Sequence, residues 1–559
     1  MGIIELKTEY GDQRAEIEAA LAKMEADKVV ERIWARDHTI WKPEPTEIIN
    51  RLGWLDIAER LQSEVGRMQA LKESLLQEGY THVLLLGMGG SSLAPEVFAK
   101  TFGAEAHGLN LSVLDSTDPG AILAHQASLD LRKTAFIVST KSGGTVETLS
   151  FFKYFYNQVL AVVGEANAGA HFIAITDPKS KLETLANDLN FRTIFINDSN
   201  IGGRFSVMSY FGLVPAALVG INVVKLIERV KSMAQTCGAG IPAGQNPGAQ
   251  LGAAMGTLTI AGRDKITFVA SPEIASFGDW VEQLIAESTG KEGKGILPVV
   301  NEPLGAPEVY GDDRFFVHLR LGNDNNTIPA LQTLAHAGHP VLHLQLNDKY
   351  DLGGQFFLWE FATAVASYLL KINPFDQPNV ESAKVMARKM VAKYEETGKL
   401  PPANFAPLTI ASLIEFLGDP AIDPSTAQAT PDRTGRGYIS LQAYVTPSPE
   451  ARAVLQQIRL KLRDTYKLAT TLGFGPRFLH STGQLHKGDS GNGLFIQITS
   501  QTSQDLPIPD KTGSEISSMS FQTLKVSQAL GDAAALEEAG RRVLRFQISQ
   551  IADLKALDL

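Results

Sequence analysis

From residue 81 onward, short apolar runs alternate regularly with helix-like stretches. In the first half of the chain these runs are His82–Leu86, Leu109–Leu114, Thr134–Ser139, His171–Thr176 and Arg192–Ile196. Such alternation is typical of βαβ units, in which helices cover both faces of a parallel sheet. A second set of apolar runs begins near residue 265. We therefore predict an α/β fold with two parallel-sheet αβα sandwich domains and an additional C-terminal αβ block.

The predicted organisation has five parts. They are an N-terminal helical segment at 1–80, a first sandwich domain at 81–235, a second at 236–398, a linker or insertion rich in Pro, Ala and Thr at 399–448, and the C-terminal block at 449–559. Residues 314–346 and 494–548 both read as strand, Q-T-L helix, strand. This likeness is either an internal repeat or the ordinary similarity of two αβ units.

Composition excludes several classes of partner. The formal charge is −10 without a long basic run, so we expect no nucleic-acid partner. No run of about 18 apolar residues is present, so no membrane span is expected. The single cysteine, Cys237, rules out an internal disulfide, and the N-terminus does not resemble a signal peptide. A cytoplasmic protein is the expectation.

An anion-binding turn is predicted at the end of the Thr134–Ser139 run. The sequence there continues T-K-S-G-G-T-V-E and then opens a helix-like stretch. A helix N-terminus presents free backbone N–H groups and the positive end of the helix dipole to an anion. Thr140, Lys141, Ser142 and Thr145 add hydroxyl groups and a cation, which predicts a phosphate site. The glycine-rich turn at Gly90 and Ser91 follows a neighbouring apolar run and is predicted to add a contact.

Four short motifs follow one another along the chain. They are T-K-S-G-G-T-V-E-T at 140–148, N-I-G-G-R-F-S-V at 200–207, Q-L-I-A-E-S-T-G-K at 283–291 and N-P-F-D-Q-P-N-V-E-S-A-K at 373–384. Together, and in this order, they resemble the motifs of the glucose-6-phosphate isomerase family. The resemblance is strongest to the isomerase half of fused transaldolase–isomerase proteins and covers nearly the whole chain, with no transaldolase half among these residues. It implies two domains of the SIS type, which are flavodoxin-like.

The resemblance also implies roles for particular residues. Glu287 is the expected base that moves a proton between C2 and C1 through an enediol, and Arg204 is the cation that stabilises the developing negative charge. Lys384 is a candidate for ring opening. Gln283 and Gln377 are expected to contact the substrate. No cofactor and no metal are expected.

The ring-opening histidine departs from the family pattern. In the family this histidine lies between the glutamate segment and the final signature, and in this chain the interval Gly295–Leu321 offers only His318, in an apolar run. The chain instead has L-H-S-T-G-Q at 479–484, similar to the bacterial motif but after the final signature. The hypothesis is that the element has been relocated and that His480 opens the ring. The alternative is an incidental loop histidine, in which case His336, His339 and His343 are the next candidates.

The predicted function is therefore the interconversion of glucose 6-phosphate and fructose 6-phosphate in glycolysis and gluconeogenesis. One alternative is a related isomerase that acts on mannose 6-phosphate or an amino-sugar phosphate. The other is a non-catalytic phosphosugar-binding module, against which Glu287 and Arg204 argue. The sequence leaves open whether the protein is a homodimer or a monomer, and whether His480 acts within its own chain.

Overall fold

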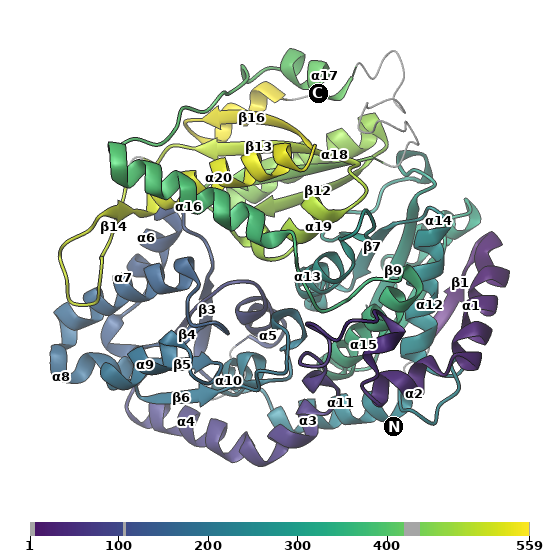
Figure 1. Cartoon of the computed structure of the whole chain (residues 1–559), viewed down its shortest axis with the longest axis horizontal. Coiled ribbons are helices and arrows are strands. Elements are labelled where there is room, and N and C mark those ends of the chain that lie inside the picture. The colour runs from purple at the N-terminus through teal and green to yellow at the C-terminus, as the bar shows by residue number, and fades with distance from the viewer. Residues whose placement is uncertain (1–5, 104–107, 419–436, 503, 558–559) are drawn as a thin grey trace.

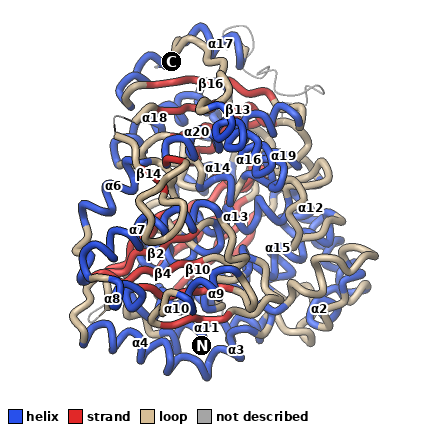
Figure 2. The backbone as a smooth tube through the Cα atoms, turned by 60° about the vertical axis from the view of Figure 1, so that its left-hand side comes forward, coloured by secondary structure: helices blue, strands red, loops and turns tan. Residues whose placement is uncertain are grey.

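The computed structural model describes residues 6–103, 108–418, 437–502 and 504–557, which build three sheets of four or five strands (Figure 1). Part of the predicted linker, 419–436, lies outside the described residues. The predicted α/β class with parallel sheets is confirmed. Helices enclose the strands on both sides (Figure 2).

The first sheet is entirely parallel, with strand order β3-β2-β4-β5-β6. Its strands are β2 (His82–Gly87), β3 (Asn110–Leu114), β4 (Thr134–Ser139), β5 (Phe172–Thr176) and β6 (Thr193–Ile196). The covering helices are α4 (Val65–Gln77), α5 (Leu93–Phe102), α6 (Pro119–Ser128), α7 (Val146–Val163), α9 (Lys181–Asp188) and α10 (Tyr210–Val219). All five apolar runs of the sequence form strands here.

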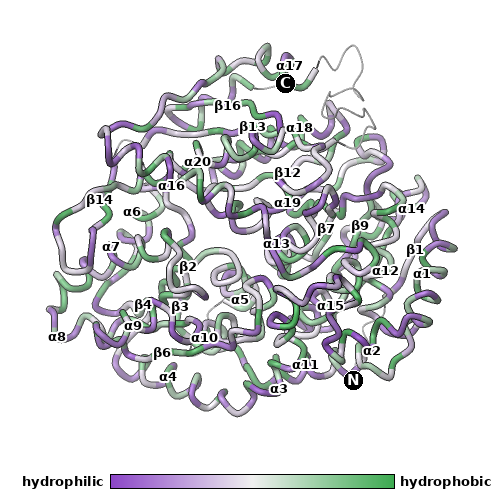
Figure 3. The backbone as a smooth tube through the Cα atoms, viewed as in Figure 1, coloured by the Kyte–Doolittle hydropathy of each residue, from purple (hydrophilic) through white to green (hydrophobic). Residues whose placement is uncertain are grey.

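Alternate residues of these strands enter two different cores. Ala135 and Ile137 of β4 join the core that contains residues of α4, α5 and α10, whereas Phe136 and Val138 join the core that contains residues of α7 and α9. Successive side chains of a strand point to opposite faces of a sheet, so a strand buried on both faces reads as a continuous apolar run. Figure 3 shows this hydrophobic character along β2.

The second sheet has strand order β1-β10-β9-β7-β8. Its strands are β1 (Leu6–Glu9), β7 (Lys265–Ala270), β8 (Leu297–Val299), β9 (Arg314–Leu321) and β10 (Val341–Leu346), and the helices of this part include α1 (Arg14–Ala26), α11 (Val223–Thr236), α12 (Pro247–Ile260), α13 (Phe277–Thr289), α14 (Ile328–His336) and α15 (Leu352–Leu370). Strand β1 pairs antiparallel with β10. The first 80 residues are therefore not purely helical, because an edge strand of the second sheet precedes their helices.

The third sheet belongs to the C-terminal part and has strand order β12-β11-β13-β16, all parallel. Its strands are β11 (Tyr438–Tyr444), β12 (Ala469–Phe474), β13 (Gly493–Ser500) and β16 (Arg542–Ile548), and its helices are α17 (Ile410–Leu417), α18 (Pro449–Tyr466), α19 (Gly483–Gly488) and α20 (Phe521–Glu538). Helix α18 ends at Tyr466, and β12 follows it after two residues. The strand–helix–strand reading of 314–346 and 494–548 is confirmed, while a common origin of the two stays a hypothesis.

The C-terminal part is packed against the first sheet unit. Lys525 of α20 donates a 2.8 Å hydrogen bond to the Asp118 carboxylate, and both side chains are buried. A hairpin arm with strands β14 (Pro507–Ile508) and β15 (Met519–Ser520) lies beside α7, and Leu506 and Ile508 join the α7 core (Figure 1). These contacts join segments that are about 400 residues apart in the sequence.

The C-terminal part also contacts the second unit. Gln484 of α19 donates to the Gly290 carbonyl at 2.9 Å, and a Cβ on Gly290 would lie 2.3 Å from the Leu485 Cα, so only glycine allows this approach. Helix α16 (Val380–Thr397), which falls within the predicted second domain, lies alongside α20 (Figure 1). Within the described segments, every helix is too short or too polar to cross a membrane.

Candidate active site

Four elements that carry predicted site residues meet at one place. They are the turn Gly89–Ser91 after β2, the turn Gly203–Phe205, helix α13, and the turn Arg477–His480 of the C-terminal part. Two glycines, Gly89 and Gly90, allow the turn after β2 to contact the backbone of the other two turns. A Cβ on Gly90 would lie 2.0 Å from the Gly203 carbonyl oxygen, and one on Gly89 would lie 2.9 Å from the His480 carbonyl oxygen. Larger residues at these two positions would separate the elements.

Arg204 and Glu287 form an ion pair inside this region. Arg204 Nη1 lies 3.4 Å from Glu287 Oε1, and the side chains are 2% and 14% exposed. Gln283, one turn earlier on α13, donates from Nε2 to Glu287 Oε2 at 2.9 Å. The i, i+4 spacing places both side chains on one helix face. The predicted base, its predicted cation and Gln283 therefore lie together.

The Arg204 guanidinium is fixed by four further acceptors. Its Nε donates to Ser288 Oγ at 2.8 Å and its Nη1 to Gln377 Oε1 at 2.9 Å. Its Nη2 donates to the carbonyl oxygens of Pro374 and Asp376. Burial lowers the pKa of Arg204 and the Glu287 carboxylate opposes this shift. Gln377, which belongs to the fourth motif, therefore lies at the site and accepts a hydrogen bond from Arg204.

The predicted phosphate turn lies between β4 and α7. Thr140 Oγ1 and Thr145 Oγ1 are 2.9 Å apart, and no side chain among the described residues caps the N-terminus of α7 at Thr145. The first N–H groups of this 18-residue helix are therefore available to an anion. Gly143 has φ +67°, a conformation that glycine adopts without strain. Ser142 is exposed beside it.

Lys141 does not lie in the turn as a free cation. Its ammonium pairs with the Asp177 carboxylate and donates to the Ser199 carbonyl oxygen. No sequence motif points to Asp177, which follows β5 on the neighbouring strand. Ser91 is buried in the adjacent turn after β2. The direct contact of Lys141 with phosphate stays a prediction.

His480 contacts a carboxylate that the sequence analysis does not single out. Its Nε2 donates to Glu147 Oε1 at 2.9 Å, and Gln528 of α20 donates to the same oxygen at 2.7 Å. Glu147 lies in the first turn of α7, directly after the phosphate turn. Burial opposes ionisation of Glu147, but the charge and hydrogen bond of His480 outweigh it, so the pKa of Glu147 is lowered. An ionised Glu147 orients the imidazole.

Lys384 takes no part in the hydrogen bonds described above. It is on α16 with its side chain 49% exposed, and its ammonium is 4.0 Å from Glu381 on the same helix. Its charge contributes to lowering the pKa of Glu147. It therefore sits on the Glu147 side of the site without a direct hydrogen bond to another predicted site residue.

Lys291, the last residue of the third motif, has a structural position that the sequence did not reveal. Its ammonium is buried and donates to the Asn373 and Asp376 carbonyl oxygens and to the Asp376 carboxylate. Burial, with the neighbouring Arg204, lowers the pKa of Lys291 to about 8. This lysine ties the end of α13 to the segment that carries Gln377. Within the described residues, no group of three or more His, Cys, Asp or Glu side chains could hold a metal ion.

Comparisons with known proteins agree with this geometry. A family model described as phosphoglucose isomerase matches residues 59–295. This span contains the phosphate turn, Arg204 and Glu287, and it ends before Gln377, Lys384 and His480. Glucose-6-phosphate isomerase of Prochlorococcus marinus is 28% identical over 430 residues, covering 68% of this chain and 79% of the relative. The enzyme of the same name from Parabacteroides distasonis is 27% identical over 383 residues, covering 60% and 85%.

Solved structures share the fold. A hypothetical protein from Thermus thermophilus matches with a TM-score of 0.60 and 24% identity, covering 70% of this chain and 100% of that one. A glucose-6-phosphate isomerase from Chlamydia trachomatis matches with a TM-score of 0.51 and 17% identity, covering 66% and 78%. The family model, the curated relatives and the assembled motif residues agree: residues 59–295 match the phosphoglucose isomerase family, and the chain is similar to glucose-6-phosphate isomerases over 60–68% of its length.

Proposed function

We propose that this protein is an aldose–ketose isomerase that interconverts glucose 6-phosphate and fructose 6-phosphate, a step of glycolysis and gluconeogenesis in the cytoplasm. The observation that carries the proposal is the Glu287–Arg204 pair, with 3.4 Å between Arg204 Nη1 and Glu287 Oε1 at the meeting point of both sheet units. A phosphosugar-binding module without catalysis needs neither a base nor a buried cation, so this pair favours an enzyme.

In the proposed mechanism Glu287 performs the proton transfer. Its carboxylate takes the proton from C2 of the open-chain aldose and returns it to C1, so that no base is consumed in the cycle. The enediol intermediate develops negative charge on its oxygens. The buried Arg204 guanidinium stabilises this charge without reorganisation, because Ser288 and Gln377 already hold it in place. Gln283 orients the carboxylate of Glu287.

Ring opening must precede this step, since the substrate is a cyclic hemiacetal. A donor gives a proton to the ring oxygen as the bond from C1 to the ring oxygen breaks, and a water molecule takes the proton of the C1 hydroxyl as the C1 carbonyl forms. We assign this role to His480, because its imidazole is held by the ionised Glu147 and lies against the Gly89 turn. The hydrogen bond from Gln528 to Glu147 fixes the pair from the other side. Lys384 assists from the same side of the site through its charge.

We assign substrate phosphate to the turn between β4 and α7. The hydroxyls of Thr140, Ser142 and Thr145 and the uncapped helix N-terminus supply donors. The Lys141–Asp177 ion pair neutralises the lysine, so the backbone and hydroxyl donors carry more of the binding than the motif alone suggests.

The first test is an isomerase assay with purified full-length protein and fructose 6-phosphate. Glucose 6-phosphate is the expected product. Mannose 6-phosphate as the main product would contradict the proposed substrate and favour the first alternative. No conversion of either sugar, with phosphosugar binding intact, would favour the non-catalytic module.

We also propose that one chain completes the site. In the structure His480 reaches Glu147 within the same polypeptide, and a buried ion pair, Lys525–Asp118, holds the C-terminal part in place. A partner subunit is therefore not needed to supply the histidine. Mixing Glu287→Gln chains with His480→Asn chains tests this. We expect no recovered activity, whereas activity well above that of either variant alone would show a site shared between chains.

A further inference from the structure

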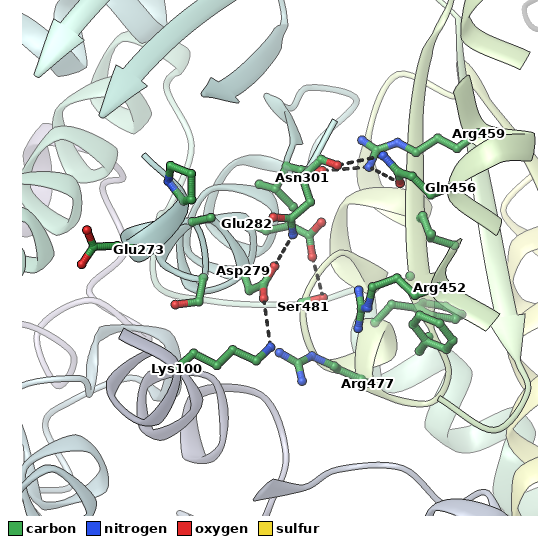
Figure 4. A pocket seen from close by; sticks show the side chains of 18 residues that line it. Lys100, Glu273, Asp279, Glu282, Asn301, Arg452, Gln456, Arg459, Arg477 and Ser481 are labelled. Atoms are coloured by element: carbon green, nitrogen blue, oxygen red, sulfur yellow. Dashed lines mark hydrogen bonds and ion pairs between the residues drawn. The ribbon is translucent and has the colours of Figure 1, made fainter. Parts of the chain in front are cut away.

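A cavity of about 500 Å³ lies between the second sheet unit and the C-terminal part (Figure 4). Two elements of the candidate active site also form its walls. Helix α13 supplies Asp279 and Glu282 to the cavity, while Gln283 and Glu287 of the same helix belong to the active site. The turn with His480 likewise has Arg477 on the cavity side, and Ser481 follows it.

The opposite wall is one face of α18. Arg452, Gln456 and Arg459 line the cavity, and their spacing of four and three residues places them along one side of the helix. Figure 4 shows these side chains extending from the C-terminal part toward Asn301 and the acidic residues of α13. At 1.5 Å per residue, Arg452 and Arg459 begin about 10 Å apart along the helix axis.

The acidic groups of the cavity already have partners. Glu273 pairs with Lys349 at 2.8 Å, and Asp279 accepts a 2.7 Å hydrogen bond from Asn301. Burial, with the neighbouring Asp279, raises the pKa of Glu282 to about 8, so this carboxyl is largely neutral at pH 7. The acidic residues of the cavity therefore do not neutralise the positive charge of the arginines on α18.

Two other cations that line the cavity, Lys100 and Arg477, already form ion pairs. Lys100 lies 2.9 Å from Glu96, and Arg477 pairs with Glu96 and with Asp115. Glu96 and Asp115, which compensate most of this charge, do not line the cavity, and Lys100 also lies 3.9 Å from Asp279, which does. The excess positive charge consequently lies on the α18 side.

Arg459 is buried with an incomplete set of acceptors. Its Nε and Nη1 donate to the carbonyl oxygens of Thr470 and Val300, but its Nη2 has no hydrogen-bond acceptor within the described residues. The nearest carboxylate, Glu302, is 3.9 Å away, and it is shared with the buried Arg314 and Arg463. A buried guanidinium N–H without an acceptor is costly, so an anion in the cavity would be favourable.

Arg452 is the second available cation. It is exposed at the cavity and lies over the Phe474 ring, 5.1 Å from the centroid, with no carboxylate partner among the residues that the structure describes. Gln456, between the two arginines, donates to the Asn301 carbonyl oxygen and offers further polar contacts. Two cations about two helix turns apart, with polar groups between them, match an extended ligand rather than a single small anion.

We propose that this cavity binds a small metabolite with an anionic group at each end and hydroxyl groups between them, such as a sugar bisphosphate. One anionic group would pair with Arg452 and the other with Arg459 Nη2. The bound ligand would also contact the turn Arg477–His480 next to Ser481, and so restrain the histidine that we assign to ring opening. Ligand binding in this cavity would therefore change turnover without competing for the active site.

The test is equilibrium dialysis of the full-length chain with labelled fructose 1,6-bisphosphate, in the presence of excess unlabelled fructose 6-phosphate to fill the active site. We expect about one bisphosphate per chain that fructose 6-phosphate does not displace. Arg452→Gln should weaken this residual binding at least about tenfold, since a charge-assisted contact is lost. Arg132→Gln, an exposed arginine outside the cavity, is the matched control and should bind like wild type.

Complete displacement of the bisphosphate by fructose 6-phosphate would overturn the proposal, because only the active site would then be occupied. Residual binding that is equal in wild type and Arg452→Gln would also overturn it. Gln456→Ala provides a second, uncharged variant in which residual binding should fall about threefold to tenfold. Initial-rate kinetics test separately whether the bound ligand affects catalysis. If the bisphosphate binds in the cavity but leaves kcat unchanged, the proposed restraint on His480 is contradicted.

Discussion

The two halves of the candidate active site are held by different kinds of interface. The half with Glu287 and Arg204 lies where the first and second sheet units meet, and residues of both units share one hydrophobic core, including Leu85 and Ile266. The half with His480 depends on the C-terminal part, whose own core is separate. That part is attached by smaller apolar contacts and by buried polar links such as Lys525–Asp118.

Because of this difference, assembly of the proton-transfer pair does not depend on how firmly the C-terminal part is attached. A shared apolar core forms together with the two units, so the proton-transfer pair is assembled as they fold. Buried ion pairs contribute less net stability, but removal of one partner is costly because the other is left uncompensated. Proton transfer should therefore tolerate loosening of the C-terminal part, and ring opening should not.

The largest effect is expected for Glu287→Gln. Loss of the base should reduce turnover by roughly 10²–10⁴-fold or more, on cyclic and open-chain substrates alike, because both routes need the C2-to-C1 transfer. Isomerase kinetics with each substrate form measure this. Glu292→Gln, an exposed neighbour after α13, is the control and should retain wild-type rates. Near-normal turnover of Glu287→Gln would place the base elsewhere.

Lys525→Met tests the docking of the C-terminal part. The change leaves the buried Asp118 without its cation and should cost about 3–5 kcal/mol. Hydrogen exchange should show earlier opening of α20 and of the His480 turn than of α13. The double variant Lys525→Met with Asp118→Asn removes the stranded charge and should regain part of that loss. Uniform destabilisation of both halves would show that the molecule unfolds as one unit.

His480→Asn should affect one step of the reaction. We expect turnover of the cyclic sugar to fall by at least about 10²-fold, the lower range for a positioned acid–base group. Proton exchange on an open-chain substrate should change far less, since Glu287 remains. Glu147→Gln should show the same separation more weakly, because it orients the histidine and does not contact the ring. Equal loss in both steps for His480→Asn would indicate a structural role.

The sheets and the Glu287–Arg204 pair could be predicted because their signals are local. The run Thr134–Ser139 forms β4 with the predicted bounds, and the motifs around Arg204 and Glu287 lie on the elements that meet. Three features could not be predicted. Strand β1 joins a strand more than 300 residues away, Asp177 neutralises Lys141 from another strand, and Glu147 meets a histidine 333 residues later. Each depends on a distant pairing that no local pattern encodes.

Thr145→Val tests the phosphate turn, which both halves of the candidate active site need for substrate binding. The phosphate turn precedes Glu147 directly, so loss of the hydroxyl should weaken phosphosugar binding by roughly 1–3 kcal/mol. The inhibition constant of a phosphorylated sugar acid measures this loss. The rate of ring opening at saturating substrate should be unchanged, because Val keeps the shape of the turn. Thr397→Val, at the exposed end of α16, controls for the loss of a hydroxyl. An unaltered inhibition constant would contradict the phosphate assignment.

The smallest effect is expected for Lys384→Ala. This lysine is half-exposed on α16 and pairs weakly with Glu381, so its removal should leave stability within about 0.5 kcal/mol of wild type. Its charge acts on Glu147 across the site, which predicts a slower ring-opening step by less than about tenfold and no change in proton exchange on open-chain substrate. Lys389→Ala, on the same helix, should change neither rate. A loss for Lys384→Ala as large as that for His480→Asn would mean that α16 brings the ammonium onto the substrate during turnover. The half of the site that opens the ring would then depend on two mobile elements, the C-terminal part and α16. The half with Glu287 and Arg204 would still be assembled before substrate binds.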